Sequence, residues 1–269
     1  MEENNKIIDE ATSFLLNPGE ISPPIIEKEN TYYINGLPSM ERNKKAEYKA
    51  LEEQNINVIG VFGMGGIGKK TLMQQMNNEM EKRSYFKFVI MNNVGGIVDD
   101  QLTTAKENIL SRCLEKVKGN ILIIFDDVWE PLNFTEIGIP LPNKSCKIIV
   151  TTRDQTVCKT MGAKEIIIDA LGTDESWKLF ESINVGSNKD VDAEVKHAVC
   201  KECAGLPLAI SVVAKSLNNN KLGEDDWLKS LRYLKNVDPE GTGGRKRIVY
   251  MSVELSYDGF EENKLKIYF

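Results

Sequence analysis

Short apolar runs alternate with amphipathic stretches between residues 57 and 169. The runs are rich in Ile, Val and Phe and are bounded by Gly, Asp, Asn or Lys, which is typical of strands that are covered on both faces. In the intervals after the first and second runs, apolar residues recur at helical spacing, over 71–83 and 101–117. We therefore expect an α/β domain with a mainly parallel sheet, whose ligands lie at the carboxyl ends of the strands. The predicted strands span 57–63, 87–91, 121–127, 147–153 and 165–169.

The strand pattern disappears after residue 170. Four amphipathic helices are predicted there, each entered through Asp, Pro or Glu near its start. A small all-α subdomain follows from this pattern. The four helices span 174–183, 192–204, 206–217 and 224–234.

The two ends of the chain have patterns of their own. Apolar residues at helical spacing between Ile7 and Leu15 predict a short helix, and Pro23-Pro24 favours an extended linker after it. A basic, glycine-rich break at 241–247 precedes another element that begins at residue 248. We expect four parts, namely a helix stub and linker at 1–30, the strand–helix domain at 31–170, the helical subdomain at 171–242 and the truncated start of a third subdomain at 243–269.

Composition narrows the functional classes without naming one. A net charge of −6 and a pI near 5.2 argue against a nucleic-acid protein held by phosphate contacts. No apolar run approaches the roughly 20 residues of a membrane span, and the first residues do not resemble a signal peptide. The five scattered cysteines favour a reducing, cytoplasmic compartment. Cys200 and Cys203 have metal-site spacing, but with no second ligand pair we interpret them as packing residues on a helix.

The segment GMGGIGKKT, residues 63–71, carries the strongest chemical signal. Gly63 and Gly68 frame the loop, with Gly65 and Gly66 between them, and Lys69 follows. Such glycines let successive N–H groups converge on one centre, the helix N-terminus adds a positive dipole, and the lysine reaches the terminal phosphates. Because the loop lies between a predicted strand and a predicted helix, we expect phosphate binding rather than only a flexible turn.

One residue departs from this phosphate-loop pattern. The pattern G-x-x-x-x-G-K-[ST] places a hydroxyl after the lysine as a ligand for Mg²⁺, whereas this chain has Lys70 there and Thr71 one residue later. Adjacent helical residues are turned by roughly 100°, so Thr71 does not simply replace the missing ligand. We expect nucleotide binding to survive, with Lys70 near the phosphates, and Mg²⁺-dependent hydrolysis to be weakened or lost. The alternative is an inactive gene copy or a sequence error.

Charged residues end two of the predicted strands. The run ILIIFDD ends in Asp126 and Asp127, of which the first would orient Mg²⁺ and the second would polarise the attacking water. The run KIIVTTR ends in Arg153, a cation that can sense a γ-phosphate. The structural alternatives are a capped turn for the two acids and a surface ion pair for the arginine.

Taken in order, these segments resemble the NB-ARC module of plant intracellular immune receptors, the nucleotide-binding leucine-rich-repeat disease-resistance proteins. Trp129 after the acidic pair resembles the coiled-coil class of these receptors. The resemblance implies a P-loop NTPase sheet with helices on both faces, an all-α subdomain and the truncated start of a winged-helix subdomain. It rests on six motifs, namely GMGGIGKKTL, ILIIFDDVW, KIIVTTRD, LGTDESWKLF (171–180), CAGLPLAI (203–210) and LSYDGF (255–260).

The family resemblance also implies a function, an ADP/ATP switch in which exchange of ADP for ATP permits oligomerisation and defence signalling. Carried over by position, Gly66, Gly68, Lys69 and Thr71 line the phosphates, and Pro207 packs on the adenine. Asp126 serves Mg²⁺, Asp127 assists hydrolysis and Arg153 senses the γ-phosphate. The implied partners are an adenine nucleotide and full-length receptors of the same family.

Departures from the family leave other functions open. The stretch NNVGG at 92–96 differs from the family, and the interval from there to residue 121 looks shorter, as if a helix were missing. The segment 34–42, where the family contacts adenine and ribose, lacks the usual arginine. The alternatives are a truncated adaptor or decoy that pairs with full-length receptors, an inactive fragment, and a P-loop ATPase that hydrolyses steadily.

Overall fold

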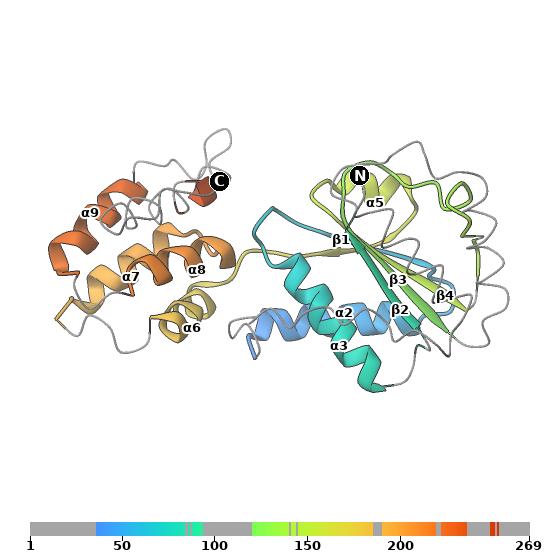
Figure 1. Ribbon diagram of the computed structural model, residues 1–269, viewed down its shortest axis with the longest axis horizontal. Coiled ribbons are helices and arrows are strands. Elements are labelled where there is room, and N and C mark those ends of the chain that lie inside the picture. The colour runs from blue at the N-terminus through green and yellow to red at the C-terminus, as the bar shows by residue number, and fades with distance from the viewer. Residues whose placement is uncertain are drawn as a thin grey trace, which may run out of the picture. The chain divides into compact units, whose positions relative to one another are not determined.

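The computed structural model describes residues 36–83, 86, 88–93, 120–139, 141–143, 145–184, 190–218, 222–235, 248–250 and 252. The described residues form two compact units (Figure 1). Of the described residues, those within 42–64 and 69–168 make up the first unit, and those within 36–41, 65–68 and 169–252 make up the second.

The first unit is built on a parallel sheet of five strands. Along the sheet their order is β2-β3-β4-β1-β5, and each neighbouring pair is parallel. The five strands predicted from apolar runs are therefore confirmed, each to within a few residues. Their bounds are Val58–Phe62 for β1, Phe88–Asn93 for β2, Ile121–Val128 for β3, Cys146–Thr152 for β4 and Lys164–Ile167 for β5.

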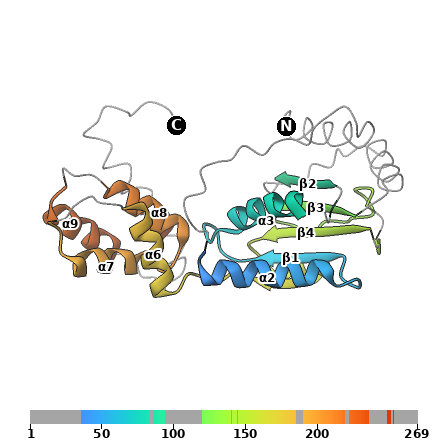
Figure 2. The same cartoon turned by 90° about the horizontal axis from the view of Figure 1, so that it is seen from below.

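Helices lie on both faces of this sheet. Helices α2 (Pro38–Glu52) and α3 (Lys69–Arg83) lie on one face, and the short α5 (Gln155–Thr160) lies on the other (Figures 1 and 2). Helix α5 begins where the carboxylate of Asp154 accepts a hydrogen bond from the backbone N–H of Thr156 at 2.8 Å. The predicted helix at 71–83 is confirmed as α3, whereas α2 and α5 are not among the helices that the periodicity predicts.

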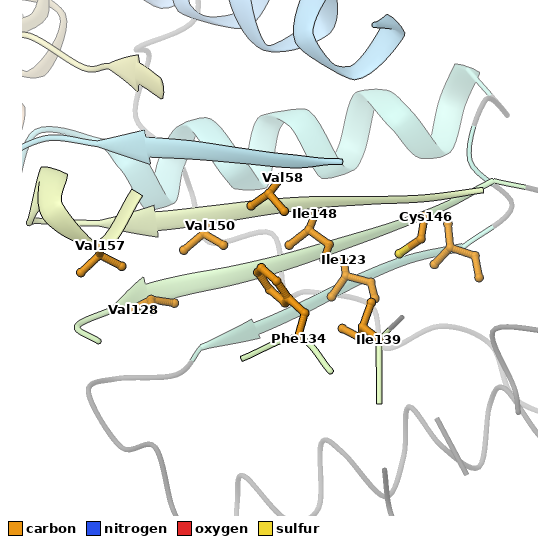
Figure 3. Close-up of a cluster of buried hydrophobic side chains, with 10 residues drawn as sticks. Val58, Ile123, Val128, Phe134, Ile139, Cys146, Ile148, Val150 and Val157 are labelled. Carbon is orange, nitrogen blue, oxygen red and sulfur yellow. The ribbon is translucent and has the colours of Figure 1, made fainter. Parts of the chain in front are cut away.

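Alternate residues of the central strands make the hydrophobic core on the α5 side. Val58, Ile123 and Ile148 from three strands pack in one cluster with Phe134 from the loop after β3 and with Val157 from α5 (Figure 3). Each of these side chains is buried, and burying a side chain of this size contributes about 1.5–3 kcal/mol. The loop after β3 therefore closes this face together with α5.

Between residues 169 and 235, the described part of the second unit contains four helices that match the predicted all-α pattern. They are α6 (Thr173–Ile183), α7 (Ala193–Glu202), α8 (Pro207–Ser216) and α9 (Glu224–Lys235). Asp192 caps α7 through the N–H of Glu194, and Pro207 occupies the first turn of α8. Phe180 and Trp227 meet edge to face in the core, with ring centroids 6.1 Å apart.

Several sequence-based expectations lie outside the described residues. These are the short helix before Leu15 and the linker after it, the helix at 101–117, the residues 94–96 and the break at 241–247. Most of the element expected from residue 248 also lies outside, although residues 248–250 and 252 are helical. Within the described part of the chain, no helix is long and apolar enough to cross a membrane.

Candidate functional site

The glycine-rich loop lies in the strand–loop–helix context that the sequence predicts. Strand β1 ends at Phe62 and α3 begins at Lys69. The ammonium of Lys69 folds back over the loop and donates to the carbonyl oxygens of Gly63 at 2.7 Å and Met64 at 2.9 Å. The side chain is buried, so these two bonds partly replace the water that a buried ammonium loses. A buried cation therefore lies against the first two residues of the loop, at the N-terminus of α3.

The glycines of the loop adopt a conformation that other residues rarely take. Gly66 has a φ of +75° and Gly68 a φ of +98°. Within the second unit, the N–H of Leu208 donates to the carbonyl oxygen of Gly66 at 3.2 Å, and a Cβ on Gly66 would lie 3.0 Å from the Cβ of Leu208. Pro207 lies nearby, since its Cγ is 4.0 Å from the position of a Cβ on Gly68. Gly66 therefore meets two requirements, the left-handed backbone and the close approach of α8.

The residues after Lys69 offer little to a magnesium ion. The side chain of Lys70 is exposed, and Thr71 is half-buried. Mg²⁺ requires oxygen ligands in near-octahedral geometry, and an ammonium cannot supply one. The described residues contain no cluster of three or more His, Cys, Asp or Glu side chains that could hold a metal. Asp126 remains as a carboxylate ligand for Mg²⁺, while the hydroxyl that other phosphate loops supply is replaced by the ammonium of Lys70.

The two acids at the end of β3 are fixed by one residue of the neighbouring strand. The hydroxyl of Thr151 donates to a carboxylate oxygen of Asp126 at 2.5 Å and accepts from the backbone N–H of Asp127 at 3.0 Å. Asp126 is buried, whereas Asp127 is partly exposed and has a positive φ of 57°. The neighbouring strand therefore places the two carboxylates in different environments, one enclosed and one open.

Arg153 binds the more exposed of these acids. Its Nε donates to Oδ1 of Asp127 at 3.1 Å and its terminal nitrogen donates to Oδ2 at 3.2 Å. The guanidinium carbon also lies 5.9 Å from the centroid of the Trp129 ring. This planar, two-pronged geometry is one that arginine can make and lysine cannot. The ion pair weighed as the structural alternative for Arg153 is thus present, and a contact of Arg153 with a γ-phosphate stays a prediction.

The charges of Arg153, Asp127 and Asp126 also affect the pKa of Lys69. Burial lowers the pKa of Lys69, and the positive charge of Arg153 lowers it further. The carboxylates of Asp127 and Asp126 oppose this decrease. Two acids and a second cation therefore lie within electrostatic range of the loop lysine, all of them in the first unit.

The structure thus brings most of the predicted residues into two groups. Lys69, Asp126, Asp127 and Arg153 gather in the first unit, while Gly66, Gly68 and Pro207 meet in the second. Gly63 and Gly65 belong to the same loop, and within the part of the chain that the structure describes the side chains of Lys70 and Thr71 form no hydrogen bond or ion pair with either group. Sequence reasoning missed Thr151, although a hydroxyl at the end of a strand beside an acidic strand end is a usable signal.

The four cysteines that the structure describes do not contribute chemistry to either group. Cys146, Cys158, Cys200 and Cys203 are all buried free thiols. Burial raises the pKa of Cys200 to about 12 and also raises that of Cys203, which disfavours the reactive thiolate.

Comparisons with known proteins place this arrangement in a family. The profile of the NB-ARC domain matches residues 40–102 and 90–190, which together are more than half of the chain. One similar protein, a probable disease resistance protein of Arabidopsis thaliana, is 29% identical over 297 residues, covering 100% of this chain and 34% of the relative. A second such Arabidopsis thaliana protein is 32% identical over 240 residues, covering 79% of this chain and 26% of the relative.

The alignments also show how much of each relative this chain covers and which solved fold it shares. The chain spans about a third of the length of the curated relatives it matches. Among solved structures, the FIGL-1 AAA domain aligns with a TM-score of 0.50 at 9% identity, over 84% of this chain and 87% of that one. That likeness shows a shared P-loop NTPase type of fold. On the strength of the matching profile, the chain belongs to the NB-ARC domain family.

Proposed function

We propose that this chain is the nucleotide-binding switch module of a plant intracellular immune receptor, with ADP bound in the resting state and ATP in the signalling state. The resemblance to disease resistance proteins supports the biological setting. The observation that carries the proposal is the buried ammonium of Lys69, which donates to two loop carbonyls and lies within electrostatic range of Asp126, Asp127 and Arg153.

The described residues divide the work of binding in this proposal. The loop N–H groups and Lys69 hold the phosphates, because a helix N-terminus and a buried cation both favour anions. Gly63, Gly65, Gly66 and Gly68 give the loop its curvature. The family resemblance assigns the adenine contact to Pro207, which lies at the start of α8 next to Gly66 and Gly68 within the second unit.

Asp126, Asp127 and Arg153 act at the terminal phosphate in this proposal. Asp126 would contribute a ligand to Mg²⁺ that accompanies the nucleotide, and Asp127 would orient water. Arg153 would bind a γ-phosphate. Lys70, in place of a hydroxyl, supplies positive charge near the phosphates instead of a metal ligand, so we expect binding that needs little Mg²⁺ and hydrolysis that is slow.

Mass spectrometry of the nucleotide released from purified protein tests this function. We expect retained ADP in near-stoichiometric amount from the unmodified chain and none from Lys69→Ala, whose fold is checked by circular dichroism. A folded, unmodified protein that retains no nucleotide and binds no added ADP contradicts the proposal.

Two further measurements, of ATP turnover and of co-purification, separate the switch from the alternative functions. Steady multiple turnover of ATP by the unmodified chain would favour an ordinary P-loop ATPase over a switch. Co-purification of this chain with a full-length relative, in the absence of any bound nucleotide, would favour the hypothesis that the chain is an adaptor or decoy.

A further inference from the structure

Trp129 is exposed for a tryptophan, with 57% of its surface open to solvent. It follows the acidic end of β3, outside the strand, and it adds little to the core. Its ring faces Arg153, whose guanidinium carbon lies 5.9 Å from the ring centroid. A guanidinium within about 6 Å of a Trp ring is attracted by the negative face of that ring. We therefore interpret the exposed ring of Trp129 as a contact surface for Arg153.

Arg153 is held by Trp129 and by Asp127 at the same time. The carboxylate of Asp127 accepts from two nitrogens of the guanidinium, at 3.1 and 3.2 Å, while the indole ring contacts the cation. The left-handed φ of Asp127, at 57°, is unusual for a residue with a side chain. Such a backbone persists when surrounding contacts fix it, and the hydrogen bond from its N–H to Thr151 is one of them.

This docked arrangement occupies both groups that the terminal phosphate needs. While both oxygens of Asp127 accept from Arg153, one acceptor site of each oxygen is withdrawn from the water that Asp127 would orient. While the edge of Arg153 formed by Nε and one terminal nitrogen binds Asp127, that edge is not available to a γ-phosphate. A γ-phosphate offers the same two-acceptor geometry with more negative charge, whereas a diphosphate has no such group.

Resting on the function proposed above, we propose that Trp129 and Asp127 hold Arg153 in a docked position that a nucleoside triphosphate must disrupt and a diphosphate leaves intact. Trp129 is then a positioning residue that sets the preference of the module for ADP over ATP. Drawing Arg153 away also frees Asp127, so that binding of the triphosphate itself makes the carboxylate available.

The test is the ratio of ATP to ADP affinity in variants of the full chain, measured by displacement of a fluorescent ADP analogue. An ATP analogue with a non-hydrolysable bridge between the β- and γ-phosphates serves as the triphosphate. Trp129→Ala removes a contact that contributes about 0.5–1 kcal/mol at exposed sites, so we expect the triphosphate to gain about two- to fivefold relative to ADP. Trp129→Phe keeps an aromatic face and should keep a ratio close to that of the unmodified chain.

A second background separates positioning from a general structural effect. In Arg153→Gln the cation is absent, so adding Trp129→Ala should leave the ratio unchanged, as a double-mutant cycle requires of two coupled residues. An unchanged ratio in Trp129→Ala alone, a shift against the triphosphate, or an equal shift in the Arg153→Gln background would each overturn the inference. Thermal unfolding followed by circular dichroism shows that each variant is folded.

Failure of the underlying function gives a different result. If the unmodified, folded chain binds neither nucleotide, then the proposed function and this inference fall together. If it binds both nucleotides and the ratio is indifferent to Trp129, then only this inference falls.

Discussion

A single hydroxyl, that of Thr151, joins the two acids at the end of β3, since it donates to Asp126 at 2.5 Å and accepts from the N–H of Asp127 at 3.0 Å. Strand β4 runs parallel to β3, and its register is irregular between Phe125 and Val128. The irregularity falls where the two acids lie. A side chain of β4 thereby satisfies groups that the ladder of backbone hydrogen bonds leaves open.

Thr151→Val tests the importance of this hydroxyl while nearly preserving the shape of the side chain. The change leaves a buried carboxylate oxygen and a backbone N–H without this partner, so we expect a loss of about 1–3 kcal/mol in the free energy of unfolding. Urea denaturation measures the loss. Thr160→Val is the control, because its exposed hydroxyl contacts a carbonyl of its own helix, and it should cost less than about 0.5 kcal/mol. Equal losses in both variants would contradict the role assigned to Thr151.

Lys70→Thr restores the hydroxyl that follows the loop lysine in other phosphate loops. We expect the affinity for ATP to become dependent on Mg²⁺, by about an order of magnitude, because a complete metal site commonly changes affinity by that much. Titration of ATP with and without Mg²⁺ measures this. Lys70→Ala removes the ammonium without adding a ligand, so it separates the two effects. If Lys70→Thr and Lys70→Ala respond alike to Mg²⁺, the missing hydroxyl is not what limits metal binding.

The strands and the helices of the second unit could be predicted because burial leaves a direct trace in the sequence. Strands covered on both faces are continuous apolar runs, as in β3 and β4, and α6 and α9 have a clear apolar stripe. Helix α2 left no such trace, because its inward face includes the buried polar residues Lys44 and Glu47. Helix α5 has only six residues, fewer than two turns, which is too short for periodicity to establish.

In the candidate site, too, some features could be predicted from the sequence and others could not. Lys69, Asp126 and Arg153 stand out because their chemistry follows from a local motif. The contacts that Asp126 and Arg153 make, with Thr151 and Asp127, depend on the pairing of β3 with β4, which is a tertiary property. The contact of Arg153 with Trp129 joins the residues that follow β4 and β3, so no local sequence pattern predicts it. Motifs therefore identified the participants, and the sheet register determined which of them meet.

Gly205 illustrates a position where the backbone excludes any side chain. Its φ is +71°, and an added Cβ would lie 2.3 Å from the carbonyl oxygen of Leu171. The same two residues are joined by a hydrogen bond from the N–H of Leu171 to the carbonyl oxygen of Gly205 at 2.9 Å. The clash is with backbone, so relief requires movement of the chain that leads into α6.

Gly205→Ala should therefore reduce the free energy of unfolding by about 3 kcal/mol or more, which is in the range of severe substitutions. Gly162→Ala is a matched control, because Gly162 has a similar φ of +62° and nothing within 4 Å of an added Cβ. We expect it to cost about 1–2 kcal/mol, the strain of the left-handed backbone alone. Denaturant unfolding compares them, and a similar loss in both would show that the contact with Leu171 relaxes readily.

Glu47 is a fully buried acid in the interior of α2. In the described part of the chain neither of its carboxylate oxygens has a hydrogen-bond partner. Burial raises the pKa of Glu47 from 4.5 to about 8, and the nearby positive charge of Lys44 opposes this increase. The folded protein thus binds a proton at neutral pH that the unfolded chain has already lost.

The pH dependence of stability follows from this difference. Between about pH 4.5 and pH 8 the folded state holds more protons than the unfolded state, so the contribution of Glu47 to stability falls as the pH rises. Glu47→Gln abolishes the titration, and its advantage over the unmodified chain should widen by up to roughly 1.4 kcal/mol per pH unit across this window. Urea denaturation at intervals from pH 6 to pH 8.5 measures the gap while avoiding the region near the pI. Glu52→Gln, an exposed carboxylate on the same helix, should retain the slope of the unmodified chain. A constant gap between Glu47→Gln and the unmodified chain over this range would mean that Glu47 is already ionised in the folded protein.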